Sequence, residues 1–279
     1  MYDTVIVRYG EIFLKSDPVR RRFMDKLSGN LQHSLEKEGL DARLYQKRHR
    51  IYIKADDPGR VAERAARAFG VTSTSPSLES EVSGLNDAAL RLAKAELSEG
   101  DTFAVRVNKM GDRSISGRAI ESEVGDIIRV NCKAKVDLEN PDVTVSIDVS
   151  GDTAYVYSKR IDGMGGLPVG TQGRVLALLH TDSDLTAALM MLRRGCSLVG
   201  VTDREENREK VRYYSDGSES FILKGSVGIN KAERMASEQE CDALVSGENA
   251  RILESNLPVF QPLIGLNADG IRKWQSKFA

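Results

Sequence analysis

Apolar and polar positions in the first seventy-odd residues alternate between a strand period and a helix period. A long amphipathic helix is predicted from Asp17 to Glu38, because Pro18 suits a first helical turn and Gly39 ends the pattern. Short apolar runs on either side predict strands, the last two of them paired and joined by the basic stretch 46–49. These strands are Thr4–Arg8, Ala42–Tyr45 and Arg50–Lys54.

A second helix follows, capped by Asp56, Asp57 and Pro58. Its apolar residues share one helical face and are Val61, Ala65, Ala68 and Phe69. With a further strand near Val71, the order becomes β-α-β-β-α-β, which is a ferredoxin-like plan. The Ser- and Pro-rich stretch Thr74–Leu78 is then predicted to be a domain boundary.

The middle of the chain predicts a small α/β module. We expect a basic polar loop over Asn108–Arg113, between a strand and a helix. The predicted helices are Asn86–Leu97 and Gly117–Asn131, and the predicted strands are Phe103–Val107, Val143–Val149 and Ala154–Ser158.

From about Leu167 onward, apolar strands alternate with helices. This rhythm predicts a mostly parallel, doubly wound sheet whose ligands bind at the carboxyl ends of the strands. The predicted strands are Val175–Leu179, Ser197–Val201, Phe221–Leu223, Ala243–Ser246 and Val259–Gln261.

Composition places few limits on function. The 279 residues are 41% hydrophobic with a formal net charge of −1, so nucleic-acid binding would need local basic patches. No apolar run approaches a membrane span and no signal-peptide pattern opens the chain. The three cysteines are far apart in sequence and form no CxxC pair, which favours a reducing, cytoplasmic location and predicts no metal site.

The segment from Gly163 to Gly195 is laid out like a phosphate-binding unit. A glycine-rich entry leads to a strand, a short loop and an amphipathic helix, whose amides could together bind an anion. The loop itself, His180–Asp184, contains no glycine and carries two carboxylates. The order of strand, loop and helix therefore indicates a nucleotide site, whereas the residue types within the loop argue against one.

Several ordered motifs carry a family resemblance. They are Arg8-Tyr9-Gly10-Glu11-Ile12 with Leu14-Lys15-Ser16, Phe103–Val107, Asn140–Val143, the linker Gly163–Thr171, Arg193-Arg194-Gly195, Ala243–Glu248 and Pro262-Leu263-Ile264. Together they resemble the tRNA 4-thiouridine synthetase (ThiI) family, over nearly the whole chain.

The resemblance implies an α/β and α+β multidomain protein. Its parts would be a ferredoxin-like N-terminal domain (1–75), a THUMP RNA-binding domain (76–166) and a doubly wound parallel-sheet, PP-loop-like domain (167–279). It also implies tRNA as partner, ATP and Mg as cofactors, and a sulfur-donor or modification partner protein. It is compatible with a homodimer.

The PP-loop departs from the family pattern Ser-Gly-Gly-x-Asp-Ser. His180–Leu185 occupy these positions, so only Asp184 is retained. Thr181 adds a β-branched side chain, and Asp182 places a carboxylate where a pyrophosphate would bind. Two unit charges about 4 Å apart repel by about 4 kcal/mol at an effective dielectric near 20. We therefore predict a degenerate loop.

The family's sulfur transfer requires reactive cysteines, and no recognisable relay cysteine is present. Cys196 precedes an apolar strand, which predicts a buried, inert thiol despite Arg193 and Arg194 nearby. Cys241 lies between Glu240 and Asp242, and this negative neighbourhood is expected to raise its pKa.

Candidate site residues fall into three groups. Asp184 is the catalytic candidate, although helix capping alone can explain it; His180 is expected to be a hydrogen-bonded structural residue. The RNA-binding candidates are Lys15, Arg20, Arg106, Lys109, Arg113 and Arg118, with a solvated charged face as the alternative. The vestigial nucleotide-binding candidates are Leu178, Leu179, Thr181, Asp182, Ser183, Gly247 and Glu248, for which an ordinary strand-to-loop turn is the alternative.

The sequence thus favours a tRNA-binding protein related to tRNA thiolation, with a degenerate nucleotide loop. An active ATP-dependent tRNA sulfurtransferase, which adenylates a uridine and then thiolates it, is one alternative. A non-enzymatic subunit of a tRNA-modification complex is another, and it predicts an exposed apolar patch on the third domain.

Overall fold

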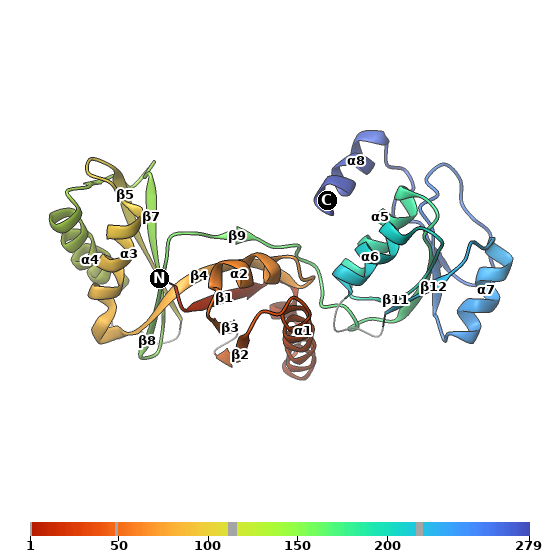
Figure 1. The fold of residues 1–279 in the computed structure, drawn as a ribbon, viewed down its shortest axis with the longest axis horizontal. Helices are drawn as coiled ribbons and strands as arrows, with labels where there is room; N and C mark the ends of the chain where they lie inside the picture. The colour runs from red at the N-terminus through yellow and green to blue at the C-terminus, as the bar shows by residue number, and fades with distance from the viewer. Residues whose placement is uncertain (1, 48–49, 111–115, 216–219) are drawn as a thin grey trace. The chain divides into compact units, whose positions relative to one another are not determined.

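The chain forms two compact units in the computed structural model, which describes residues 2–47, 50–110, 116–215 and 220–279 (Figure 1). The first unit contains 1–8, 40–63 and 73–162. The second contains 9–39, 64–72 and 163–279. Each unit therefore combines segments that are distant in sequence.

The first unit is built around a single nine-stranded sheet. Its order is β2-β3-β1-β4-β8-β7-β5-β6, and β9 pairs with β4. The strands are β1 (Thr4–Tyr9), β2 (Ala42–Lys47), β3 (Arg50–Ala55), β4 (Val71–Glu81), β5 (Thr102–Met110), β6 (Lys135–Val136), β7 (Val143–Ser150), β8 (Thr153–Tyr157) and β9 (Ile161–Asp162). The predicted pairing of the two strands beside 46–49 is confirmed, because β2 and β3 are antiparallel.

The predicted domain boundary at Thr74–Leu78 lies within a buried part of β4. Its polar side chains make hydrogen bonds to the backbone inside the protein. Thr74 Oγ1 donates to the Ala62 carbonyl at 2.9 Å, and Ser77 Oγ donates to the Thr4 carbonyl at 3.1 Å. Such bonds remove the cost of burying a hydroxyl group.

Helices α3 (Leu85–Glu96) and α4 (Gly117–Cys132) bury their apolar faces against β5, β7 and β8. The first residues of the loop expected over Asn108–Arg113 belong to β5 instead. Asn108 and Lys109 pair with Asp148 and Val149 of β7, and 111–113 lie outside the described residues. Helix α2 (Pro58–Ala66) is shorter than predicted, and Ala68 and Phe69 lie beyond its end.

A five-stranded sheet forms the centre of the second unit, in the order β12-β11-β10-β13-β14. All of its strand pairs are parallel, which confirms the doubly wound prediction. The strands are β10 (Arg174–Leu178), β11 (Ser197–Thr202), β12 (Phe221–Lys224), β13 (Ala243–Val245) and β14 (Val259–Phe260).

Helices cover both faces of this sheet. Side chains of α5, α6 and α8 share a core on one face, and α7 packs on the other. The helices are α5 (Asp182–Arg193), α6 (Glu205–Tyr214), α7 (Ile229–Glu238) and α8 (Ala268–Lys277); η1 (Glu11–Leu14) and α1 (Asp17–Lys37) precede them in the chain. None of the helices in the described ranges is long and apolar enough to cross a membrane.

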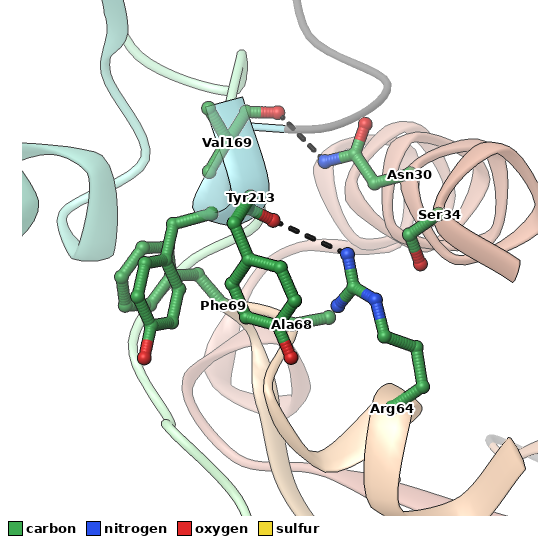
Figure 2. Close-up of a pocket in the computed structure, with 8 residues that line it drawn as sticks. Asn30, Ser34, Arg64, Ala68, Phe69, Val169 and Tyr213 are labelled. Atoms are coloured by element: carbon green, nitrogen blue, oxygen red, sulfur yellow. Dashed lines mark hydrogen bonds between the residues drawn. The ribbon is translucent and has the colours of Figure 1, made fainter. Parts of the chain in front are cut away.

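Two buried polar side chains attach the N-terminal segments of the second unit (Figure 2). Arg64 donates to the Tyr213 carbonyl at 3.2 Å, and its guanidinium lies 4.4 Å from the centre of the Tyr213 ring. Asn30 of α1 donates to the Val169 carbonyl at 3.0 Å. These contacts hold α1 and the end of α2 against α6 and the linker that precedes β10.

Glycines in the linker 163–171 permit close backbone packing. A Cβ on Gly163 would lie 2.3 Å from the Val71 carbonyl oxygen, and one on Gly166 would lie 2.2 Å from that of Arg193. Gly166 also has φ +81°, which disfavours other residues. The linker motif is therefore explained by packing within the second unit.

Candidate nucleotide loop and nucleic-acid interface

The loop between β10 and α5 satisfies its own polar groups. Thr181 is the N-cap of α5, and its hydroxyl accepts a hydrogen bond from the Asp184 amide at 3.1 Å. In return, Asp184 accepts one from the Thr181 amide at 3.0 Å. The predicted capping role of Asp184 is confirmed, and the two residues form a reciprocal capping box.

The turn after β13 packs directly onto this capping box. The Gly247 amide donates to Asp184 Oδ1 at 2.8 Å. A Cβ on Gly247 would lie 2.3 Å from the Asp184 nitrogen and 2.5 Å from the Ser183 carbonyl oxygen. Glu248, the next residue, donates its amide to Ser246 Oγ at 3.1 Å. The structure therefore brings Thr181, Ser183, Asp184, Gly247 and Glu248 into one neighbourhood.

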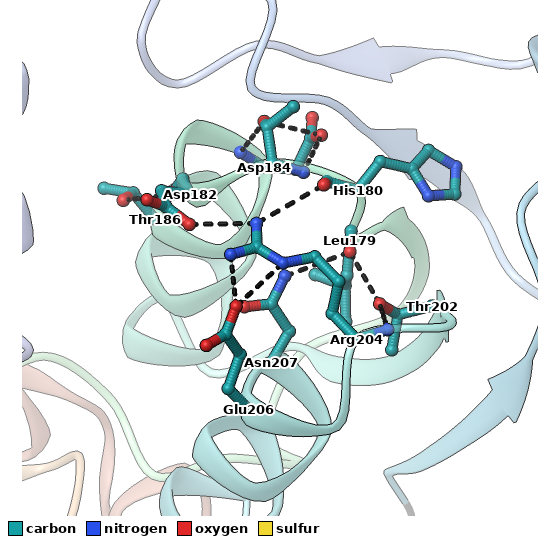
Figure 3. A network of polar contacts seen from close by, with 10 residues as sticks. Leu179, His180, Asp182, Asp184, Thr186, Thr202, Arg204, Glu206 and Asn207 are labelled. Atoms are coloured by element: carbon teal, nitrogen blue, oxygen red, sulfur yellow. Dashed lines mark hydrogen bonds and ion pairs between the residues drawn. The ribbon is translucent and has the colours of Figure 1, made fainter.

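Asp182 is paired with an arginine that the sequence reasoning missed. Arg204 Nη1 lies 2.9 Å from Asp182 Oδ1, and the same guanidinium also binds Glu206 (Figure 3). These two carboxylates raise the pKa of Arg204, Glu206 contributing most. Arg204 follows the end of β11, where the rule for doubly wound sheets places ligand-binding side chains, and that signal could have found it.

The backbone carbonyl just before the loop also has hydrogen-bond partners. The Leu179 carbonyl accepts from Thr202 Oγ1 at 2.7 Å and from Asn207 Nδ2 at 3.0 Å. His180 Nε2 lies 3.2 Å from the Val227 carbonyl oxygen, which confirms the expected hydrogen bond of this histidine. Leu178 ends β10, and the Leu179 side chain is fully buried.

A pocket of about 410 Å³ opens beside Asp182 and Arg204. It lies between α5, α6 and the C-terminal residues of the chain, and both polar and apolar side chains line it. The lining residues are Asp182, Leu185, Thr186, Leu189, Arg204, Glu206, Asn207, Lys210, Gln275 and Phe278.

Burial makes the cysteines of this unit poor nucleophiles. Cys196 and Cys241 are both buried, and burial raises the pKa of each thiol, to about 11 for Cys241. The predicted direction for Cys241 is confirmed. Its main cause is loss of hydration, and Asp242 contributes less.

Three RNA-binding candidates lie in the first unit. Arg106 and Arg118 are exposed, and Lys109 is half-buried on β5. A Cβ on Gly117 would lie 3.8 Å from Lys109 Cδ, so the start of α4 is next to this lysine. Arg113 lies outside the described residues.

Lys15 and Arg20 belong to the second unit. Lys15 is exposed directly after η1, and Arg20 is half-buried on α1, where it pairs with Asp17. A surface salt bridge of this kind contributes little to stability.

The fold defines a class: an α/β protein that combines a nine-stranded sheet, part of it ferredoxin-like, with a doubly wound parallel-sheet domain. Residues 4–75 match the ThiI ferredoxin-like domain, and residues 79–159 match the THUMP domain. Among curated proteins, a probable tRNA sulfurtransferase of Aeropyrum pernix is 30% identical, over 97% of this chain and 82% of its own length. The chain belongs to the tRNA sulfurtransferase (ThiI) family.

Other relatives agree with this assignment. A probable tRNA sulfurtransferase of Methanothermobacter thermautotrophicus is 29% identical, over 95% of this chain and 82% of its own. That alignment spans 323 residues, more than the 279 of this chain, so it includes positions that this chain lacks.

Two crystal structures share the fold. One is PH1313 from Pyrococcus horikoshii, with TM-score 0.85, 29% identity and 99% coverage of both chains. The other is a 4-thiouridine synthetase–RNA complex with bound ATP, with TM-score 0.83 and 22% identity, covering all of this chain and 85% of that one.

Proposed function

We propose that this protein captures tRNA through its first two domains and that its nucleotide loop is degenerate. The domains of this proposal are 1–75, 76–166 and 167–279. The observation that carries the second part is the capping box of Thr181 and Asp184, together with the pairing of Asp182 to Arg204. Both interactions occupy groups of the chain that a bound triphosphate would otherwise use.

The hydrogen-bonding of the loop argues against a bound phosphate. A phosphate site at a helix N-terminus depends on amides that point at the ligand. Here the amides of Thr181, Asp184 and Gly247 already donate to side-chain oxygens. Binding a phosphate through them would first require breaking these bonds.

The local charge argues in the same direction. Asp182 and Glu206 both pair with Arg204. A polyphosphate would therefore compete with two carboxylates for that guanidinium and be repelled by them, which lowers its affinity. The loop residues therefore do not fit ATP, and we derive no adenylation step through it. Mg would enter only with the nucleotide.

Support for RNA capture comes from the THUMP match and from Arg106, Lys109 and Arg118. Arginine binds phosphate through two parallel hydrogen bonds, and lysine adds attraction that is independent of sequence. One structural relative was crystallised with RNA. By this proposal the three side chains contact the RNA backbone.

A tRNA titration at several salt concentrations tests this proposal. We expect binding that weakens linearly on a log–log plot, with a slope of about −0.7 to −0.9 per phosphate contact. A triple variant of Arg106→Gln, Lys109→Gln and Arg118→Gln should flatten the slope. Arg272→Gln, an exposed change on α8, is the matched control and should leave it unchanged. No binding at low salt, or an affinity that does not change with salt in the unsubstituted protein, would reject RNA contact by these side chains.

An active ATP-dependent tRNA sulfurtransferase is a second candidate. It is favoured by the names of the relatives and by the ATP in one structural neighbour. Calorimetry with ATP and Mg²⁺ separates the two candidates, because an active enzyme would bind ATP well below millimolar concentration.

A non-enzymatic subunit of a modification complex is a third candidate. It is favoured by exposed apolar side chains of the second unit, where Ile252, Phe260 and Ile264 are 79%, 45% and 44% exposed. A pull-down with Phe260→Ser and Ile264→Ser as comparison would test whether a partner, or a second copy of the chain, binds there. Equal recovery of partners by both proteins would reject this surface.

A further inference from the structure

A tryptophan of the second unit has two cations next to its ring. Trp274 of α8 is the only tryptophan in the sequence, and its side chain is half-buried. The guanidinium carbon of Arg193, the last residue of α5, lies 5.5 Å from the centre of this ring, and Lys277 Nζ lies 5.6 Å from it. Phe278 stacks beside the indole with 5.8 Å between the ring centres. We call Trp274, Arg193 and Lys277 the indole–cation site.

No carboxylate balances the two cations of this site. In the described ranges, neither Arg193 nor Lys277 forms an ion pair. Lys273 precedes Lys277 by one turn on the same side of α8 and adds a third positive charge. The one acidic residue of α8, Asp269, pairs with Arg272 instead. The surface around the indole is therefore positively charged.

The two cations are held close together although they repel each other. Arg193 is fixed because its Nε donates to the Met164 carbonyl at 2.8 Å. Both cations lie in the last turn of a helix, where the helix dipole attracts positive charge. Partial burial and, to a lesser extent, the charge of Arg193 lower the pKa of Lys277. A bound anion would relieve this repulsion, which neither the carbonyl nor the dipole neutralises.

The site is open to solvent, so a ligand needs no enclosed cavity to reach it. Lys277 is exposed, and Arg193 and Trp274 are half-buried. A nucleotide matches this surface in two ways, because its phosphate pairs with arginine and lysine and its base stacks on an aromatic ring. An acidic peptide would supply the negative charge without the ring. The combination of indole and cations therefore favours a nucleotide.

We propose that the indole–cation site binds one nucleotide of single-stranded RNA, with the phosphate on Arg193 and Lys277 and the base against Trp274. The site is separate from the nucleotide loop, because Asp182 begins α5 and Arg193 ends it, about 16 Å farther along the helix. It adds a contact from the domain 167–279 to those of the first two domains. The assignment to RNA rests on the proposed function, whereas the affinity for phosphate follows from the site alone.

The fluorescence of Trp274 reports directly on this site, because the chain has no other tryptophan. We would titrate the protein with inorganic phosphate and, at equal ionic strength, with chloride. We expect a saturable change of the emission in phosphate only. Lys277→Gln should remove most of this change, and Lys277→Arg, which keeps the positive charge, should retain it.

Arg272→Gln is the matched control. It removes a positive charge from the same helix, two residues before Trp274 and so near the opposite side of α8. This variant should keep the full response to phosphate. An identical response to phosphate and chloride in the unsubstituted protein would overturn the site, and so would an undiminished response in Lys277→Gln.

Titrations with tRNA, a short oligouridylate, AMP and polyglutamate identify the ligand. If RNA fills the site, both RNAs should quench Trp274, and Lys277→Gln should bind tRNA roughly threefold to tenfold more weakly at low salt, with a salt slope smaller by about 0.7. A response to AMP without one to the oligouridylate would assign the site to a free nucleotide and overturn the assignment to RNA. An equal response to polyglutamate would overturn it in favour of an acidic protein.

The two proposals fail in different ways. If tRNA binds and Lys277→Gln leaves both its affinity and the fluorescence unchanged, this site is wrong and the proposed function stands. If no tRNA binds to any variant, the proposed function and the assignment to RNA both fail. The phosphate titration then still decides whether the indole–cation site binds an anion.

Discussion

The two units place their arginine–carboxylate contacts in different surroundings. In the first unit, Asp148 contacts Arg8 and Arg50, and its side chain is only 2% exposed. In the second unit, Arg204 contacts Asp182 and Glu206, whose side chains are 72% and 68% exposed. A buried carboxylate depends on its charged partners for stability, whereas exposed pairs contribute little to it. The same kind of contact is therefore expected to matter for folding in the first unit and for ligand binding in the second.

The largest expected effect is at Asp148. Asp148→Asn removes a buried carboxylate that pairs with Arg8 and Arg50, so the free energy of unfolding should fall by about 3 to 5 kcal/mol. Urea unfolding measures this loss. Asp126→Asn, which breaks an exposed pair with Arg129, is the control and should cost under about 1 kcal/mol. Equal losses in the two variants would show that the buried pairs of Asp148 contribute no more than an exposed one.

Gly247→Ala should disturb the second unit. Its new Cβ would lie 2.3 Å from backbone atoms of Ser183 and Asp184, which cannot move as an isolated side chain could. We expect a loss of about 1 to 3 kcal/mol by urea unfolding. Gly125→Ala, on α4 in open space, should instead stabilise by about 0.5 to 1 kcal/mol. A neutral Gly247→Ala would mean that the turn does not press on the capping box.

Removing both acids around Arg204 should reverse the local charge of the loop. Asp182→Asn with Glu206→Gln frees the guanidinium for a phosphate, so any affinity for ATP should rise roughly tenfold in calorimetry. Glu205→Gln, which removes a neighbouring acid that pairs with Arg208, should change it less than twofold. No gain in the double variant would show that charge is not what opposes the nucleotide.

The smallest effect concerns the Cys241 thiol. Burial raises its pKa to about 11 from its ordinary value of 9.0, so the folded protein holds the proton through this interval. The stability contributed by the neutral thiol is complete below pH 9 and declines as the pH rises from there toward 11. Alkylation of the native protein, followed by mass spectrometry, should show Cys241 reacting slowly at pH 8 and faster only near pH 11. Rapid labelling at pH 8 would contradict its burial.

Periodicity predicted most strands and helices, because each strand of the parallel sheet is a short apolar run such as Ser197–Thr202. It did not show that Thr74–Leu78 continues β4, because hydroxyl groups that bond to the backbone inside a strand resemble a turn in the sequence. The capping role of Asp184 could be predicted because a capping box is local. The pairing of Arg204 with Asp182 and the meeting of Arg8, Arg50 and Asp148 join distant positions, and only the fold brings these together.

The central claim is that the first unit binds a polyanion while the loop of the second does not. Parallel calorimetric titrations of one preparation, with tRNA and with ATP–Mg²⁺, test it most directly. We predict tRNA binding that weakens steeply with added salt, and no measurable heat from ATP below millimolar concentration. Micromolar ATP binding, with tRNA either unbound or indifferent to salt, would contradict the account.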